Sequence, residues 1–288
     1  MKRLLAVLAA AAMVGGSLYL RYGDDGDEES GRADGGGEGP PQLVCDPLFE
    51  EVCDGADAEV TIEDAAATVD RLLGGDRVPD AWLAPGPWPA IVDALGTPGV
   101  PSRFDEVAPL ARSGLVAVGR ADLEGCGWRC FGSRVGDDDL ELGWTGPATG
   151  LGLVTVGAVS SGFFRGEPFA TNDLSGEFIG YLSRFADQAR QARAPVQDVI
   201  VTNGSAFDVA VSPEAEAEPL VEARRGTRVG LLYPEPVVTV EAVLAGRDTD
   251  LTDSLRADLL DRGWERPSED PTGLPSAGVL AALLGRVR

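Results

Sequence analysis

The chain has 288 residues, of which 44% are hydrophobic, so it is long enough for one large domain or for two lobes with separate cores. Its formal charge of −23 argues against nucleic-acid binding, because phosphate recognition depends on clusters of lysine and arginine. The absence of histidine excludes a Ser-His-Asp triad and a histidine metal site. Neither a phosphate-binding P-loop nor a dinucleotide-binding glycine motif is present, and we expect no cofactor.

Residues 1–21 have the pattern of a signal peptide or a membrane anchor. Lys2 and Arg3 precede an uncharged, largely apolar run from Leu4 to Leu20. The run is close to the shortest that spans a bilayer, while the small residues from Gly15 to Ser17 would also permit cleavage. We favour a single retained anchor, which leaves the rest of the chain outside the cytoplasm because Lys2 and Arg3 stay inside. The alternative is a protein secreted after signal cleavage.

Residues 22–41 are rich in glycine, aspartate and glutamate and offer almost nothing apolar to bury. This composition predicts a disordered acidic linker. The folded domain is therefore expected at residues 42–288.

The four cysteines fall into two local pairs, Cys45 with Cys53 and Cys126 with Cys130. An even number of cysteines in an exported chain favours disulfides, for which three pairings are possible. The local pairing is preferred, because it would join the end of a first strand to the end of the short helix after it and would close a tight loop at CGWRC. A metal site is the competing interpretation, but histidine is absent and neither spacing is that of a zinc motif. We therefore expect two disulfides and no metal.

Alternating strands and helices are predicted for the first part of the domain. Pro47 and Pro87 mark helix starts, and Gly74 with Gly75 marks a helix end. The predicted strands are Leu43–Cys45, Glu59–Ile62 and Pro79–Leu83, and the predicted helices are Pro47–Val52, Ala65–Leu73 and Trp88–Leu95. This order predicts a parallel sheet covered by helices.

The second part of the domain has weaker signals. Residues 121–150 show little periodicity and are predicted to be an irregular insertion, whereas Leu151–Val159 is predicted to be a strand. Val196–Ile200 fits a helix, and a strand is the alternative. The other predicted strands are Leu115–Gly119, Phe207–Val211 and Val229–Leu232, and the other predicted helices are Leu174–Phe185, Glu214–Arg225, Leu251–Leu260 and Ala277–Leu284.

Two stretches carry a resemblance to a known family. The segments SAFDVAVSPEAEAEPL and VGLLYPEPVVTVEAVLA resemble the C-terminal half of extracellular solute-binding proteins with the type II periplasmic-binding-protein fold. The resemblance implies an α/β fold of two lobes, each with a mostly parallel sheet flanked by helices. It places residues 42–114 and 229–288 in the first lobe and residues 115–228 in the second. It also implies ligand capture without chemistry, so we expect no enzyme.

Ligand contacts are expected in loops that follow strands, where α/β folds bind their ligands. The resemblance implies such contacts at the loops of Ala84 and Ser212, and two hydroxyls with a glycine after the predicted strand Leu151–Val159 indicate a third loop. The expected ligand-binding residues are Ala84, Pro85, Gly86, Ser160, Ser161, Gly162, Ser212, Glu214 and Tyr233, the last of which would line the hinge. Ser160 to Gly162 could equally form an ordinary turn, and Glu214 could be a favourable charge at a helix start. Trp82 and Trp88 could wall the cleft or belong to the core.

Two functions follow as hypotheses. In the first, a membrane-tethered receptor captures a small polar or anionic solute between its lobes, with a membrane transporter or another cell-envelope protein as partner. In the second, the fold has lost its ligand and acts in extracellular protein interaction or assembly. A cleft lined by unpaired hydroxyl and N–H groups would favour the first, and an apolar, shallow cleft would favour the second. A carboxylate enzyme, such as a glycosidase, is a minor alternative because its two carboxyl groups must converge in space.

Overall fold

A computed structural model of the chain describes residues 39–120, 123–201, 207–224, 228–246 and 251–287. The predicted signal peptide or anchor and nearly all of the predicted linker lie outside these ranges. No helix within the described ranges is both long and apolar enough to cross a membrane.

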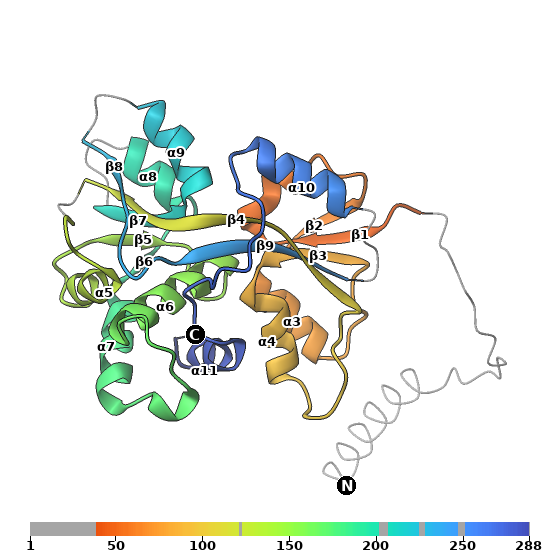
Figure 1. Cartoon of the computed structure of the whole chain (residues 1–288), viewed down its shortest axis with the longest axis horizontal. Coiled ribbons are helices and arrows are strands. Elements are labelled where there is room, and N and C mark those ends of the chain that lie inside the picture. Colours follow the sequence, from red (N-terminus) through yellow and green to blue (C-terminus); the bar gives the residue numbers. More distant parts are fainter. Residues whose placement is uncertain (1–38, 121–122, 202–206, 225–227, 247–250, 288) are drawn as a thin grey trace, which may run out of the picture. The chain divides into compact units, whose positions relative to one another are not determined.

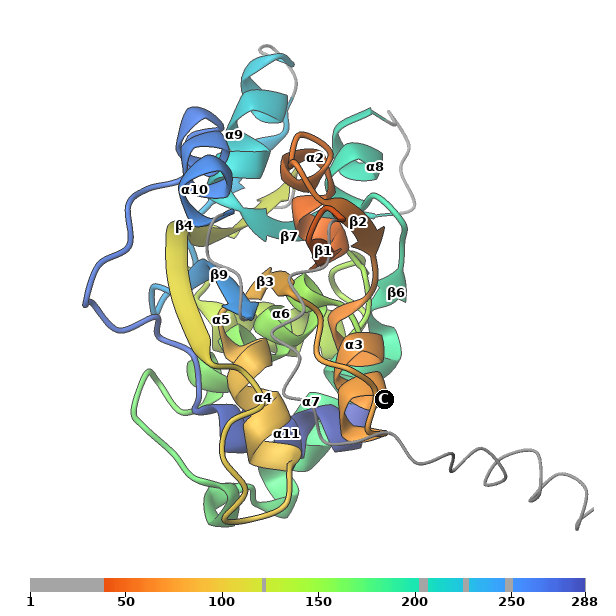
Figure 2. The same ribbon diagram turned by 90° about the vertical axis from the view of Figure 1, so that its right-hand side faces the viewer.

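The first lobe begins with alternating strands and helices, as predicted. Strands β1 (Gln42–Cys45), β2 (Glu59–Ile62) and β3 (Ala81–Pro85) are parallel. A short helical segment, η1 (Pro47–Phe49) with α2 (Glu50–Cys53), follows β1. Helix α3 (Ala65–Leu73) follows β2, and helix α4 (Pro87–Leu95) follows β3. Helices α3 and α4 cover one face of the sheet (Figure 2). Helix α2 and the later α10 (Thr252–Asp261) cover the other face. Helix α11 (Ala277–Val287) packs beside α4.

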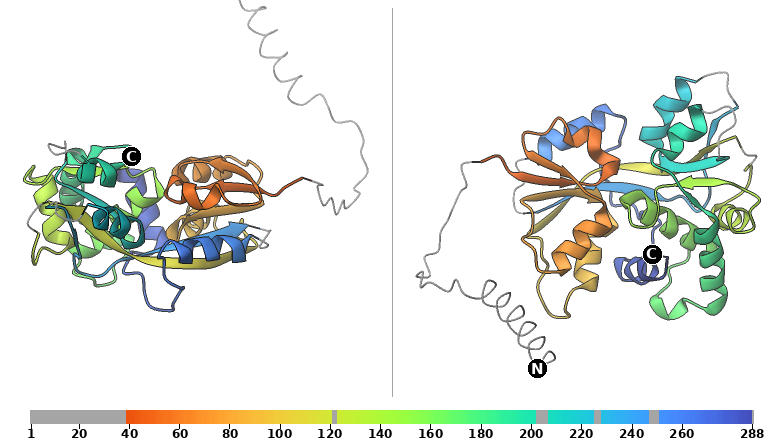
Figure 3. Two further views of the ribbon diagram at one scale, coloured as in Figure 1. Left: turned by 90° about the horizontal axis from the view of Figure 1, so that it is seen from above. Right: turned by 180° about the vertical axis from the view of Figure 1, so that it is seen from behind.

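Two long neighbouring strands join the lobes (Figures 1 and 3). Strand β4 (Glu106–Gly119) pairs antiparallel with β9 (Thr239–Gly246) through Gly114. From Leu115 onward β4 pairs instead with strands of the second lobe. The predicted strand Leu115–Gly119 is thus only the last part of β4, and the alternation of β9 escaped prediction.

The second lobe contains β5 (Leu142–Trp144), β6 (Arg190–Gln191), β7 (Val209–Pro213) and β8 (Gly230–Leu232). β5 lies parallel to both β6 and β7, and β4 lies antiparallel to both β7 and β8. In each lobe, one strand is antiparallel to its neighbours: β9 in the first lobe and β4 in the second. The expected return to the first lobe at Val229 comes too early, because β8 still pairs with the second-lobe part of β4.

Helices cover both faces of the second sheet (Figure 1). They are α5 (Trp128–Gly136), α6 (Gly150–Phe163), α7 (Gly176–Gln188), α8 (Pro195–Val201) and α9 (Glu214–Glu222), and a short turn, η2 (Thr171–Asp173), precedes α7. Helices α5, α6 and α7 pack together on one face, and α8 and α9 lie on the other. The helical interpretation of Val196–Ile200 is confirmed. The helix predicted at Leu174–Phe185 is α7, which begins two residues later and buries Phe178, Tyr181, Leu182 and Phe185.

The prediction of a strand over Leu151–Val159 is wrong, because these residues belong to α6. The helix is buried along almost its whole length, so the run is apolar on every side and lacks the periodicity that separates a helix from a buried strand. The irregular insertion predicted for residues 121–150 is also wrong in large part, because it contains α5 and β5. Both disulfides are confirmed: Cys45–Cys53 joins the end of β1 to the end of α2, and Cys126–Cys130 joins the loop before α5 to the first turn of that helix.

Candidate functional site

The two lobes are in contact at Gly150, the first residue of α6. The backbone N–H of Gly150 donates to the carboxylate of Asp46 at 3.0 Å, and its carbonyl accepts from the indole N–H of Trp88 at 3.3 Å. A second backbone bond crosses nearby, from Ala66 N–H to the carbonyl of Ala148 at 3.0 Å. These contacts fix the start of α6 against the strand ends of the first lobe.

Asp46 is the centre of this contact and is 1% exposed. Its Oδ1 accepts from the N–H of Leu48 at 3.1 Å, and its Oδ2 accepts from the N–H groups of Ala65 at 3.3 Å and of Gly150 at 3.0 Å. Ala65 and Gly150 are the first residues of α3 and α6. One carboxylate therefore binds the starts of two helices that belong to different lobes.

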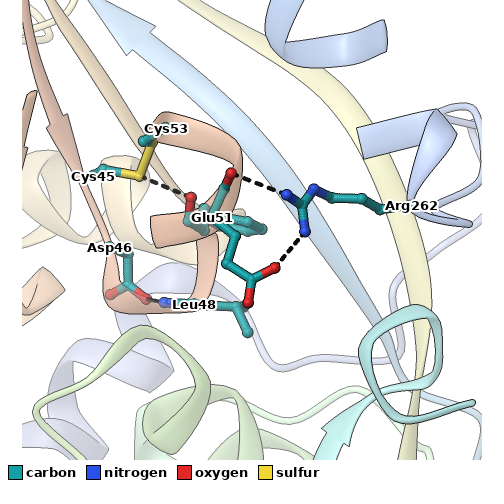
Figure 4. The surroundings of a disulfide bond; sticks show 7 residues. Cys45, Asp46, Leu48, Glu51, Cys53 and Arg262 are labelled. Carbon is teal, nitrogen blue, oxygen red and sulfur yellow. Dashed lines mark hydrogen bonds and ion pairs between the residues drawn. A yellow bond between two sulfur atoms is a disulfide. The ribbon is translucent and has the colours of Figure 1, made fainter. Parts of the chain in front are cut away.

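The local sequence explains why Asp46 lies there. β1 ends at Cys45, and Pro47 cannot continue a ladder but is suited to a first helical turn, so Asp46 takes the N-cap position of η1. The Cys45–Cys53 disulfide closes the loop that contains Asp46 and η1 (Figure 4). On the far side of this loop, Arg262 donates to the Glu51 side chain at 2.6 Å and to its carbonyl at 3.0 Å. The disulfide and the contacts of Arg262 together hold this loop in place.

Burial raises the pKa of Asp46 from 3.8 to about 6. The N–H groups of Leu48, Gly150 and Ala65 act in the opposite direction, because they stabilise the anion, and the charge of Asp64 adds to the increase. The hydrogen bonds therefore offset only part of the cost of removing the carboxylate from water.

A cavity of about 500 Å³ lies between the lobes beside this contact. The first lobe lines it with η1, α2 and Arg262, and the second lobe lines it with Leu151 of α6, Ser212 of β7, the start of α8 with the two residues before it, and one side of α9. Its volume lies within the range of small-molecule sites.

The cavity wall combines apolar side chains with a few charges. Glu51 and Arg262 of the first lobe form an ion pair at 2.6 Å, and Arg193 of the second lobe also lines the cavity. Glu216 accepts from the indole N–H of Trp264 at 2.8 Å, which is a further bond between the lobes. Charged side chains of both signs therefore line the cavity.

The loop Ala84 to Gly86, predicted to bind a ligand, lies at the contact between the lobes but is packed. Ala84 and Pro85 are buried at the end of β3, and Gly86 N–H donates to the carbonyl of Glu241 at 2.8 Å. A Cβ on Gly150 would lie 2.6 Å from Cγ of Pro85. Pro85 therefore forms part of the wall against which α6 abuts. Trp82 and Trp88 are fully buried, as the core interpretation expects.

Ser160, Ser161 and Gly162 do not end a strand, because they lie in the last turn of α6, and all three are buried. The Ser160 hydroxyl donates to the carbonyl of Val156 at 2.7 Å, and that of Ser161 donates to the carbonyl of Gly273 at 2.7 Å. A Cβ on Gly162 would lie 2.5 Å from Cβ of Trp128. These residues pack α6 against its neighbours and are not among those that line the cavity.

Ser212, Glu214 and Tyr233 lie near the crossing strands. Ser212 lines the cavity and is 4% exposed. Glu214 accepts from the Tyr233 hydroxyl at 2.7 Å, and this bond, followed by burial, raises the pKa of Tyr233 to about 12. Tyr233 is 62% exposed and stands outside the cavity. Of the nine predicted ligand contacts, Ser212 is the one that the cavity includes.

Sequence reasoning missed Asp46, Thr149, Gly150, Glu216 and Arg262. A local signal existed for two of them. Asp46 precedes a proline at the end of a strand, which is a cap pattern, and Thr149 precedes an apolar run and caps α6 by accepting from Gly152 N–H at 3.0 Å. No local signal links Asp46 to Gly150, which lies 104 residues away in the chain.

Comparison with known proteins adds information on the fold. No protein-family model matches the chain, and no curated protein sequence matches it. Solved structures of periplasmic binding proteins do match. The fold is theirs. AfuA from Actinobacillus pleuropneumoniae, with fructose-6-phosphate bound, matches at a TM-score of 0.52 and 11% identity, over 87% of this chain and 97% of that chain.

Two further structures agree. Iron-bound HitA from Pseudomonas aeruginosa matches at a TM-score of 0.53 and 11% identity, over 86% of this chain and 97% of that chain. A periplasmic thiamin-binding protein matches at 0.53 and 10% identity, over 86% of this chain and 95% of that chain. At such identities the likeness establishes the two-lobed α/β fold, and the ligand must be argued from this chain. Within the described ranges, no group of three or more acidic or cysteine side chains is placed to hold a metal ion.

Proposed function

We propose that the chain is an extracytoplasmic solute-binding protein, which captures a small polar solute in the cavity between its lobes. Residues 1–21 serve as its membrane anchor and residues 22–41 as its tether, and a transporter or another cell-envelope protein is its partner. Two local disulfides support an address outside the cytoplasm, because such bonds persist in oxidising compartments. Among the proteins that share its fold, AfuA has fructose-6-phosphate bound, HitA has iron bound, and a third is a periplasmic thiamin-binding protein.

The cavity is the observation that supports this proposal best. Both lobes contribute to its wall, so a solute that fills it would contact both at once and would favour the closed arrangement. Charged groups of both signs and the Ser212 side chain supply polar contacts within an otherwise apolar wall.

Native mass spectrometry of the secreted domain can reveal a retained solute, and a thermal-shift screen can identify others. The matched pair Ala194→Trp and Ala67→Trp then places the site. Ala194 lines the cavity, whereas Ala67 is exposed on α3. We expect a solute at a hundred times its dissociation constant to stabilise the wild type and Ala67→Trp by about 2.7 kcal/mol and to leave Ala194→Trp unchanged. A screen up to the millimolar range without any shift would contradict the proposal.

The apolar part of the wall favours a second candidate, an interaction module without a solute. Leu48, Val52, Leu151 and Val196 all line the cavity, and Leu220 stands at it 36% exposed. A partner protein would bury such a surface. A photo-crosslinking residue at Leu220 tests this in the native envelope: a single crosslinked protein together with a negative solute screen would support it.

A further inference from the structure

The helix starts that meet between the lobes already hold an anion, and this anion belongs to the protein. We propose that the carboxylate of Asp46 is a tethered anion that fills an anion-accepting position between the lobes and so excludes free anions from it. This occupancy goes beyond the solute-binding proposal and does not depend on it.

The donors around Asp46 have the arrangement of an anion site. They are backbone N–H groups from three segments, at 3.1 Å for Leu48, 3.3 Å for Ala65 and 3.0 Å for Gly150. Ala65 and Gly150 open helices of nine and 14 residues, whose positive ends favour negative charge. Hydrogen bonds to a charged acceptor are stronger than neutral ones. The first N–H groups of two helices donate to one carboxylate, so the anion is favoured by two positive helix ends and not by one.

Asp46 is not the local cap of either helix. An N-cap side chain serves the helix that begins directly after it, whereas Asp46 lies 19 residues before Ala65 and 104 residues before Gly150. α6 has its own cap, Thr149, and Asp64 directly before α3 makes no capping bond with its side chain. The carboxylate of Asp46 therefore occupies a position that the anionic group of a ligand could take. It lies near these helix starts because of the fold and not because of its place in the sequence.

No room remains there for a second anion while the lobes are in contact. Asp46 is 1% exposed, and a Cβ added to Gly150 would lie 2.7 Å from its carboxyl carbon and 2.6 Å from Cγ of Pro85. A free anion would have to displace the carboxylate.

Removing the carboxylate should create a site for a small external one. The test uses the full ectodomain with Asp46→Ala, and formate as the probe, because formate fits the space that the carboxylate leaves. Asp64→Ala is the matched control: it removes one nearby charge from an exposed side chain that makes no capping bond. Gluconate, an anion too large for the space, controls for ionic strength.

We expect formate to raise the Tm of Asp46→Ala in a saturable manner, by about 3 °C at ten times its dissociation constant. The wild type and Asp64→Ala should respond to formate only as they respond to gluconate. A folded Asp46→Ala protein on which formate and gluconate act alike would overturn the proposal. No solute of the cavity enters this experiment, so its outcome is separate from that of the solute screen.

A second measurement covers the case in which Asp46→Ala does not fold. Asp46→Asn keeps the size and one acceptor oxygen but loses the charge. In amide NMR spectra, it should move the signals of Leu48, Ala65 and Gly150 together to lower proton frequency, because all three lose a charged acceptor, whereas Asp64→Asn should leave Leu48 and Gly150 unmoved. If the signal of Gly150 stays in place in Asp46→Asn, the carboxylate does not serve the second lobe, and the proposal fails.

Discussion

The two ends of α6 carry similar residues and differ completely in role. At its start, Thr149 and Gly150 meet the first lobe, and Gly150 binds Asp46. At its last turn, Ser160, Ser161 and Gly162 are packed against α5 and the chain before α11. Both ends offer hydroxyl groups and a glycine, so composition alone does not separate them.

The difference arises from the direction of the helix. The first N–H groups of a helix have no partner within it and can bind groups from elsewhere, such as the carboxylate of Asp46. N–H groups in the last turn already donate to carbonyls within the helix, so Ser160 and Gly162 have only side-chain or packing roles left. A cluster of hydroxyls and glycine indicates a binding site only when it lies at the correct end of its element.

The largest effect should come from the pH dependence of Asp46. Its folded pKa of about 6 lies above its ordinary value of 3.8, so ionisation opposes folding. The penalty is absent below about pH 4 and complete above about pH 6, where it amounts to about 3 kcal/mol. Asp46→Asn lacks this titration. The free energy of unfolding of the wild type, relative to Asp46→Asn, should therefore rise by up to that amount between pH 7 and pH 4.

Urea unfolding of both proteins across this pH range checks the sign. The Asp64→Asn variant is the control, because Asp64 is exposed and contributes only part of the increase in the pKa of Asp46. A difference between wild type and Asp46→Asn that stays constant with pH would show that Asp46 is not buried as an anion.

A pair of identical substitutions compares the two ends directly. Gly162→Ala would place a Cβ 2.5 Å from Arg129 N and from Cβ of Trp128, inside the packed second lobe, and should cost about 2 kcal/mol. Gly150→Ala would instead meet Pro85 and Asp46 of the other lobe. The contact that it strains lies between the lobes and not within one core, so we expect a smaller loss of stability, with the lobes moving apart and the radius of gyration increasing.

Chemical denaturation and small-angle X-ray scattering together decide this comparison. Two outcomes would contradict the roles assigned to the two ends of α6. One is a Gly162→Ala protein with an increased radius of gyration. The other is a Gly150→Ala protein that has the radius of gyration of the wild type but is much less stable.

The smallest effects should come from the hydroxyl groups. Thr149→Ala removes the cap of α6, its bond from Gly152 N–H at 3.0 Å, and should cost about 1 kcal/mol. Ser160→Ala removes only a bond to the carbonyl of Val156 in the same helix, and alanine is the better helix former, so we expect a change near zero. Thermal unfolding measures both, and equal losses at the two positions would contradict the distinction.

The strands and helices of residues 42–95 could be predicted from the sequence because they have local boundaries, whereas β9 and the first-lobe part of β4 were not predicted. Pro47 and Pro87 mark helix starts, and Gly74 marks a helix end. The predicted helix Ala65–Leu73 has the same bounds as α3. α6 could not be predicted, because its residues are apolar on every side and strand and helix then give the same pattern. The error displaced the expected site to Ser160, Ser161 and Gly162, ten or more residues beyond the start of the helix.

The contact at Asp46 was beyond sequence reasoning for another reason. Its donors come from residues that are distant in the chain, and only the completed fold brings Gly150 beside the loop after β1. The two disulfides were predictable because each closes within ten residues. Sequence patterns therefore located local constraints well and the meeting of the lobes poorly.

The two indole bonds between the lobes give the protein an optical reporter of its own closure. All five tryptophans are buried. Within the described residues, only two of them donate a hydrogen bond to the other lobe: Trp88 donates to Gly150, and Trp264 donates to Glu216. The indole N–H groups of Trp82, Trp128 and Trp144 have no partner in that same part of the chain. If the lobes separate, water reaches Trp88 and Trp264 while the other three stay enclosed. Fluorescence emission would then move to longer wavelength on opening and back on closing, without any added dye.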